Sequence, residues 1–465
     1  MRATRQPVSR TTRGIASTLG RAAVAGVLLL TMGACGDDLV VPDLNNPSVE
    51  DQVANASRES VAAATHGLLR TTRDNAASMV QWLGAFGREG YPMSQTGASL
   101  TGSVVNALNG ANFPGGSLWA TPYRNIRNAN LLLSALDGVE DMTDAEKEGV
   151  RGFARTVQAY DFLNLILTRD RFGIPVDVDR DPNAEPAPIV SRDEAYRHVI
   201  DLLDQAAGHL GAAGGTFSFS VHSGLADFES PAAFLRLNRA LRARVAVYLD
   251  EWGEALTALD QSFLDLDGPL EAGAYHIFTT NSGDATNPLN RPDFLYAHTR
   301  IRSEARSRPD GGIDRRAETK VRDAAPLTVS GISSDLVFTL YESPSASVPW
   351  IRNEELILLR AEALIGLNRY DEAEEALNRV REEAGGLAPV ELSAANALDE
   401  LLYDKRYSLL WEGGHTWLDL RHYGRLLEIP TTSADPRIFE AMPFPANECT
   451  ARTPPPDGCG VIEGL

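Results

Sequence analysis

The stretch Tyr407-Ser-Leu-Leu-Trp-Glu-Gly-Gly-His-Thr-Trp-Leu-Asp-Leu-Arg-His-Tyr-Gly-Arg425 indicates the fold of this chain more clearly than any other. Residues 398–410, which run into it, have the apolar spacing of an amphipathic helix. The adjacent Gly413 and Gly414 then favour a helix end or a turn, because glycine adopts backbone conformations that other residues avoid. Residues 417–421 predict the start of a second short helix.

The order of residues in this stretch resembles the C-terminal signature of the SusD/RagB family of cell-surface nutrient-binding lipoproteins. The matching positions, to which the resemblance gives a structural role, are Glu412, Gly413, Asp419, Leu420 and Arg421. The chain departs from the family pattern by one extra Gly, and by having Thr416 or His415 where the family usually has Arg. Further along, residues 443–448 are similar to the segment with which family members close.

The N-terminus has the features of an export signal. Five arginines and no acidic residue precede an apolar run of 11 residues, 22–32. A membrane-spanning helix needs roughly 20 apolar residues, so the shorter run predicts a secretory signal. It ends at Gly33-Ala34-Cys35, where small residues before Cys are typical of lipoprotein cleavage. We therefore expect residues 1–34 to be removed and Cys35 to carry the lipid that anchors the chain. An ordinary secretion signal with an incidental Cys is the alternative.

Composition changes along the chain predict its organisation. Residues 35–55 are rich in Asp, Asn and Pro and are expected to form an extended tether, as at the start of mature SusD-like chains. Residues 56–465 then form one SusD-like domain. We expect a helical part over 56–267, a loop-rich insertion over 268–349 and a second helical part over 350–465.

Helical periodicity predicts a mostly α fold, with long irregular loops and minor β content. Residues 233–263 and 351–383 each resemble a tetratricopeptide helix pair; their turns lie 118 residues apart, so the pairs are dispersed rather than tandem. Strands are expected only at residues 336–341 and in a hairpin at 216–221. Four longer helices are predicted at residues 60–72, 119–131, 146–168 and 191–210.

The charge of the chain limits its partners. Without the five arginines of the signal, the 43 basic residues fall to 38 against 63 acidic ones, a net charge of −25. Such a surface repels phosphate backbones, so we expect no nucleic-acid binding.

Two cysteines remain beside Cys35. Cys449 and Cys459 lie ten residues apart in a segment rich in Pro and Gly. In an oxidising compartment such a pair is expected to close a small disulfide loop. Metal binding by the two thiols is the alternative.

No sequence motif of an enzyme or a cofactor site is found. The chain has no phosphate loop, no His-Glu-x-x-His, no Cys-x-x-Cys and no Gly-x-Ser-x-Gly. His415, Asp419 and His422 have a spacing at which a helix could present them to a metal, but a structural role is the simpler interpretation. The acidic pairs Glu354-Glu355 and Glu382-Glu383 are expected on solvated helix faces.

Aromatic residues in loop-like segments are the better candidates for a binding site. Sugar rings stack on aromatic rings while amides and carboxylates bond to their hydroxyl groups. The residues that we expect to bind ligand in this way are Trp82, Tyr91, Phe294 and Tyr296. Packing within the core is the alternative for each.

The resemblance implies a lipid-anchored protein of the outer membrane that is not an enzyme and needs no cofactor. It would capture oligomeric nutrients, either glycan or peptide, for a TonB-dependent β-barrel transporter of the SusC type. A tetratricopeptide adaptor that binds proteins is one alternative. A surface hydrolase is another, and would require a pair of carboxylates with a raised pKa in a cleft.

Overall fold

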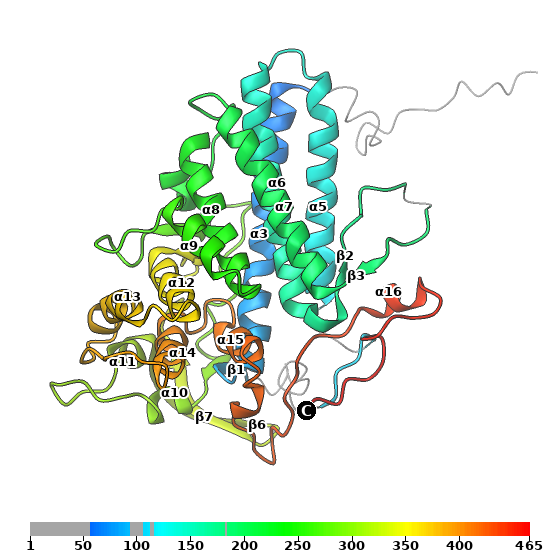
Figure 1. Ribbon diagram of the computed structural model, residues 1–465. Coiled ribbons are helices and arrows are strands. Elements are labelled where there is room, and N and C mark those ends of the chain that lie inside the picture. Colours follow the sequence, from blue (N-terminus) through cyan, green and yellow to red (C-terminus); the bar gives the residue numbers. More distant parts are fainter. Residues whose placement is uncertain (1–55, 94–105, 112–115, 182–183) are drawn as a thin grey trace, which may run out of the picture. The chain divides into compact units, whose positions relative to one another are not determined.

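The protein is represented by a computed structural model that describes residues 56–93, 106–111, 116–181 and 184–465 (Figure 1). Residues 53–465 form one compact unit. Cys35, the expected signal and the tether lie outside the described residues. Within the described ranges, no helix combines the length and the apolar character needed to cross a membrane.

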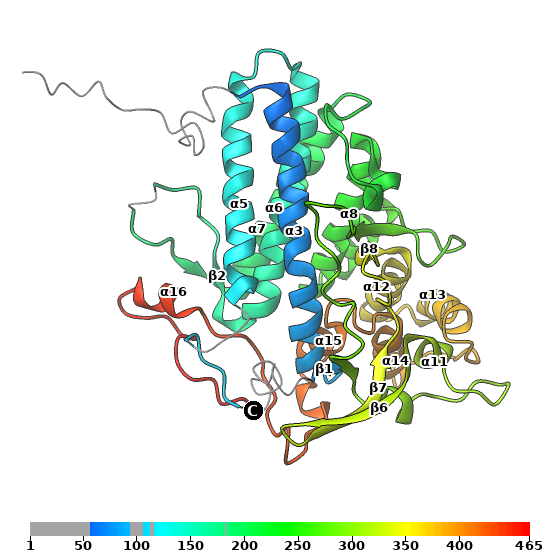
Figure 2. The same ribbon diagram turned by 180° about the vertical axis from the view of Figure 1, so that it is seen from behind.

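Four long helices stand side by side in both views (Figures 1 and 2). They are α3 (Arg58–Phe86), α5 (Ser117–Ala135), α6 (Asp144–Arg169) and α7 (Arg192–Ala212). Capping boxes fix three of the starts, because Ser57, Thr143 and Ser191 each accept a bond from a backbone N–H of the first turn. At the start of α7, Glu194 completes the box by accepting a bond from the Ser191 N–H. Helix α3 extends well beyond the predicted residue 72, and its buried face continues through Leu83 and Phe86.

The two predicted helix pairs are present. They are α8 (Pro231–Tyr248) with α9 (Trp252–Asp260), and α12 (Asn353–Gly366) with α13 (Tyr370–Glu383). Although they are far apart in sequence, α9 packs against α12. At this contact Gly366 lies against the Trp252 indole, where a side chain would clash with the ring. The dispersed pairs therefore form one continuous helical scaffold, and the expected mostly α fold is confirmed.

Residues 268–349 contain more regular structure than their composition suggests. An antiparallel sheet has the order β1-β5-β7-β6, and β4 pairs with β8. The bounds are β1 Gly90–Pro92, β4 Gly273–His276, β5 Leu295–Ala297, β6 Val321–Val329, β7 Ile332–Phe338 and β8 Val348–Arg352. Two short helices also occur, α10 (Arg300–Ser303) and α11 (Arg315–Lys320).

One strand prediction is nearly right and the other is wrong. The strand expected at residues 336–341 overlaps β7, which begins earlier, at Ile332. Residues 216–221 form no strand. Instead, Phe217 and Phe219 stack on each other and contact Phe153 of α6, so their alternation serves packing against a helix. The small pair β2 (Ile174–Pro175) and β3 (Ile189–Val190) follows α6.

The C-terminal part contains α14 (Ala397–Ser408), α15 (His415–His422) and α16 (Ala446–Thr450). The two helices predicted around the glycine pair are thus α14 and α15. The predicted disulfide between Cys449 and Cys459 is also present. The tail that it closes is held to the body, because Phe444 donates its N–H to the Gly458 carbonyl and Leu108 pairs with Ile462 in a β-bridge.

The end of α3 packs tightly against the segment between α14 and α15. We call this contact, which involves Leu83, Gly84, Glu89, Trp411 and Gly414, the interlock. A Cβ on Gly84 would lie 2.5 Å from the Trp411 ring, and one on Gly414 would clash with Leu83. Gly414 also has φ +76°, a left-handed conformation that disfavours other residues. Glu89 completes the contact by accepting bonds from the Trp411 N–H at 2.9 Å and the Thr416 N–H at 3.3 Å. Glu89 therefore caps α15 from a distant part of the chain.

We predict that Gly414→Ala lowers the free energy of unfolding substantially. A left-handed Ala costs about 1–2 kcal/mol and the overpacking against Leu83 about 1–3 kcal/mol more. Gly67→Ala is the matched control, because Gly67 lies on α3 with no neighbouring atom within 4 Å of an added Cβ. The control should stabilise the helix by about 0.5–1 kcal/mol. Denaturant unfolding measures both effects, and equal stabilities for the two variants would refute the interlock.

Candidate functional site

The residues of the family-like motif lie inside the protein and bind other parts of it. Glu412 accepts bonds from Arg352 at 2.8 and 2.9 Å and from Lys320 at 3.2 Å. Burial alone would raise the pKa of Glu412, but Arg352 and Lys320 outweigh it and lower the pKa to about 2. The carboxylate therefore stays charged and ties β8 and α11 to the motif. A Cβ added to Gly413, beside it, would lie 3.5 Å from the His415 ring.

The second half of the motif binds two further helices. Asp419 lies 2.6 Å from Lys405 of α14, which also binds Glu362 of α12 at 2.7 Å. Burial raises the pKa of Asp419, and the Lys405 ammonium opposes that rise. Arg421 donates to the carbonyls of Leu167 and Glu440. Leu420 is half-buried against the main core. These contacts support the structural role that the resemblance implies.

The prediction that both acidic pairs lie on solvated helix faces is wrong for one of them. Glu354 and Glu355 are buried rather than solvated. Glu355 forms a bidentate ion pair with Arg244 of α8, at 2.7 and 2.8 Å. Glu354 pairs with Arg352. Arg244 comes from a distant segment, so sequence spacing alone could not reveal its pairing with Glu355, whereas Arg352 lies only two residues before Glu354. Residues 382 and 383 are exposed, as expected.

The three residues considered as possible metal ligands, His415, Asp419 and His422, each have different surroundings. Asp419 binds Lys405, and His422 Nε2 lies 3.1 Å from the Asp250 carboxylate. His415 faces the interior between helices. Across the described part of the chain, no three His, Cys, Asp or Glu side chains come together in a way that could hold a metal ion.

The structure corrects the ligand-binding assignment of three aromatic residues. Trp82 is 4% exposed, Tyr91 1% and Tyr296 7%, so their rings offer no free face to a sugar. Trp82 belongs to α3 rather than to a loop, and the Tyr91 hydroxyl donates to Asp435. The Gly-rich composition around them reflects close packing at the interlock. Phe294 alone is half-buried, with the exposed Arg291 guanidinium 4.6 Å from its ring centre.

A groove at the end of α6 has the composition of a sugar site. It encloses about 550 Å³. Phe172, in the 3₁₀ turn Asp170–Phe172 after α6, is half-buried in its wall, and Gly458 lies against the ring. Arg171 lies over the same ring at 5.0 Å and pairs with Glu440 at 3.1 Å. The remaining lining comes from the tail: Asp457, Gly458, Gly460, Val461, Ile462, Glu463, Gly464 and Leu465. The groove thus combines an aromatic ring, charged hydrogen-bonding groups and apolar surface.

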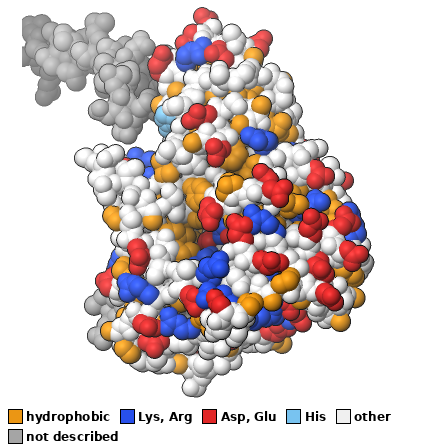
Figure 3. All heavy atoms as spheres, turned by 90° about the vertical axis from the view of Figure 1, so that its left-hand side faces the viewer, with side chains coloured by type: hydrophobic (Ala, Val, Ile, Leu, Met, Phe, Trp, Pro, Cys, Tyr) orange, Lys and Arg blue, Asp and Glu red, His pale blue; other side chains and the backbone are white. Residues whose placement is uncertain are grey.

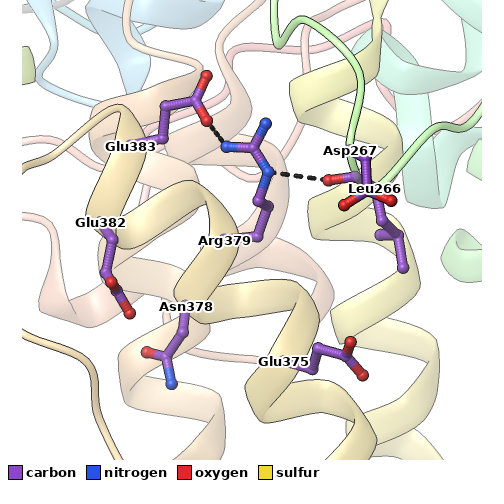
Figure 4. A pocket seen from close by; sticks show the side chains of 7 residues that line it. All are labelled: Leu266, Asp267, Glu375, Asn378, Arg379, Glu382 and Glu383. Atoms are coloured by element: carbon purple, nitrogen blue, oxygen red, sulfur yellow. Dashed lines mark hydrogen bonds and ion pairs between the residues drawn. The ribbon is translucent and has the colours of Figure 1, made fainter.

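A larger groove of about 710 Å³ lies on α13 and lacks an aromatic ring (Figure 4). Its polar side chains are mostly acidic. The single basic one, Arg379, is already bound to Glu383 and to the Leu266 carbonyl. On the side of the molecule shown in Figure 3, acidic and basic side chains are interspersed. The α13 groove therefore fits a sugar less well than the groove at Phe172.

The sequence did not single out Arg171, Phe172 and Glu440 as a site. Arg171 and Phe172 lie just after the helix predicted at residues 146–168. An aromatic residue beside Arg, directly before the Gly173 turn, was the available signal. Glu440 lies 269 residues downstream of Arg171, so their pairing is visible only in the fold.

Burial raises the pKa of several carboxyls, and each is bound inside the fold. Glu89 accepts backbone N–H bonds, Asp161 accepts from Asn125 and Asp404 from Arg316. Among the described residues, none of these three lines either groove.

Comparison with known proteins agrees with the resemblance. Residues 339–445 match the sequence model of the SusD family. No curated protein matches the chain. Among solved structures, Bacteroides fragilis NanU aligns with a TM-score of 0.65 at 15% identity, covering 89% of this chain and 99% of its own.

Two other solved structures have the same architecture. A SusD-like carbohydrate-binding protein from Bacteroides fragilis has a TM-score of 0.63 at 14% identity, covering 81% of this chain and 88% of its own. A laminarin-binding SusD-like protein has a TM-score of 0.59 at 18% identity, covering 84% and 97%. Identities this low show a shared fold. In sequence, the match to the SusD family covers residues 339–445, which include the motif from Glu412 to Arg421.

Proposed function

We propose that the protein captures oligosaccharides without cleaving them, in the groove formed by Arg171, Phe172, Glu440 and the disulfide-closed tail. The observation that carries this proposal is the combination of an aromatic ring with a partly exposed Arg–Glu pair in one groove. Some similar structures are described as carbohydrate-binding or laminarin-binding. A peptide is the other ligand class to be tested.

The chemistry of the groove suits a neutral sugar. The Arg171 side chain is 57% exposed above Phe172, so a sugar ring can replace it there and present its C–H groups to the aromatic ring. The displaced guanidinium and the Glu440 carboxylate can then donate to and accept from hydroxyl groups. Hydrogen bonds to charged groups contribute about 1.5–3 kcal/mol each, so two of them would strongly influence affinity.

We further propose that the protein hands its ligand to a SusC-like TonB-dependent transporter in the outer membrane, to which a lipid on Cys35 holds it. The acidic, tetratricopeptide-like scaffold and the expected lipoprotein signal support this arrangement. The adaptor alternative would use the same scaffold to bind proteins without a sugar ligand.

The first test of the groove uses two matched Arg–Glu pairs. Arg171→Ala and Glu440→Gln should each weaken oligosaccharide binding about tenfold, because each removes a charged hydrogen-bonding group worth at least about 1.4 kcal/mol. Arg322 and Glu342 form a comparable exposed pair at 3.1 Å, with Arg322 on β6. Arg322→Ala and Glu342→Gln should therefore leave affinity unchanged. Titration calorimetry measures all four, and equal effects at both pairs would contradict the proposal.

Phe294 remains a candidate secondary contact. Replacing it with Ala should weaken binding severalfold, since a stacked ring contributes on the order of 1 kcal/mol, while stability changes little. Trp82→Ala is the contrast, because loss of a buried Trp costs about 3–5 kcal/mol of stability. Binding and thermal unfolding of both variants separate the two roles. If Phe294→Ala binds like the wild type, Phe294 is not a contact.

The membrane arrangement is tested by affinity purification from native membranes. The wild-type protein should bring down a large β-barrel in near-equal amount, and Cys35→Ser should move the protein to the soluble fraction. If the wild-type protein is recovered alone while other outer-membrane complexes survive, the transporter partnership is refuted. If Cys35→Ser stays on the membrane, the anchor lies elsewhere.

A further inference from the structure

A small polar cavity lies behind the segment that joins α14 to α15. It encloses about 50 Å³ and is lined by side chains from α3, α6, α8, β8 and the 412–418 segment. Ligand pockets of proteins are typically about 300–1,000 Å³, so this space is too small for a sugar. At about 30 Å³ for each molecule in the liquid, it has room for one or two waters.

Buried polar groups face this cavity. Trp350 is 3% exposed, and its indole Nε1 has no hydrogen-bond partner. Asn164 of α6 lines the cavity and is also buried. His415 completes the set. Burial holds the pKa of His415 at about 4, so near neutral pH the imidazole is uncharged, with one nitrogen that donates and one that accepts.

Leaving the Trp350 indole N–H without a partner is unfavourable. A buried donor or acceptor without a partner costs about 1–3 kcal/mol, whereas buried waters typically make two to four bonds to such groups. Apolar cavities stay empty, but the lining of this one, although partly apolar, includes an indole N–H, an amide, an imidazole, the Arg244 guanidinium and the Glu412 carboxylate. Both its size and its lining therefore match water.

We propose that this cavity is a buried hydration site, in which one or two ordered waters bridge Trp350 Nε1, the Asn164 amide and the His415 imidazole. The waters would connect β8 and α6 to the motif segment, which otherwise reaches those elements through the Glu412–Arg352 pair and Arg421. The waters would thus stabilise the fold around the motif, and this role does not depend on ligand capture.

The direct test is a crystal structure at a resolution that shows ordered water. The proposal predicts water density within about 2.7–3.2 Å of Trp350 Nε1 and of His415. A cavity without density would overturn it.

A test in solution compares the direction of the melting-temperature change on replacing each of two buried asparagines. Asn164→Leu keeps a similar side-chain volume but removes both the hydrogen bond between Asn164 and Tyr160 and a polar partner of the waters, so its melting temperature should fall by a few degrees. Asn75 of α3 is the control, because it is 1% exposed, both of its amide atoms lack partners, and it does not line the cavity. Asn75→Leu removes an unsatisfied buried amide and should raise the melting temperature. An equal rise in both variants would show that the cavity is dry.

Discussion

The contact between the end of α3 and the segment around Trp411 and Gly414 is the constraint on which the rest of the structure depends. Two glycines, Gly84 and Gly414, let the two backbones approach each other closely. Glu89 fixes the approach by capping α15. Since α3 is also part of the four-helix N-terminal scaffold, this contact joins the first and last thirds of the chain.

The interlock positions the proposed sugar groove through Arg421. From α15, this side chain bonds to the Leu167 carbonyl near the end of α6 and to the Glu440 carbonyl. The same two segments supply Arg171 and Glu440 to the groove. The family-like motif thus does not bind ligand in our account. It holds the two walls that do, and the disulfide-closed tail completes the lining.

The fold could be predicted from sequence where local signals were strong. Helical periodicity and the pairing of Cys449 with Cys459 each depend on residues close in sequence, and both predictions were confirmed. The motif at Glu412 lies within the residues that match the SusD family model. The sheet was missed because its strands are short or exposed on one face. Hairpin-like alternation at Phe217 and Phe219 was misread, since packing on α6 gives the same pattern.

The candidate site was harder to predict, because glycine-rich segments occur both in loops and where backbones pack closely in the core. Around Trp82 and Tyr91, glycine marks close packing in the core rather than a loop, so the aromatic residues there are buried. The pairing of Arg171 with Glu440 depends on tertiary structure alone.

A crystal structure with an oligosaccharide that binds in solution tests the account most directly. We predict an intact sugar over Phe172, bonded to Arg171 and Glu440. A sugar bound in the α13 groove instead, or a cleaved one, would contradict the account.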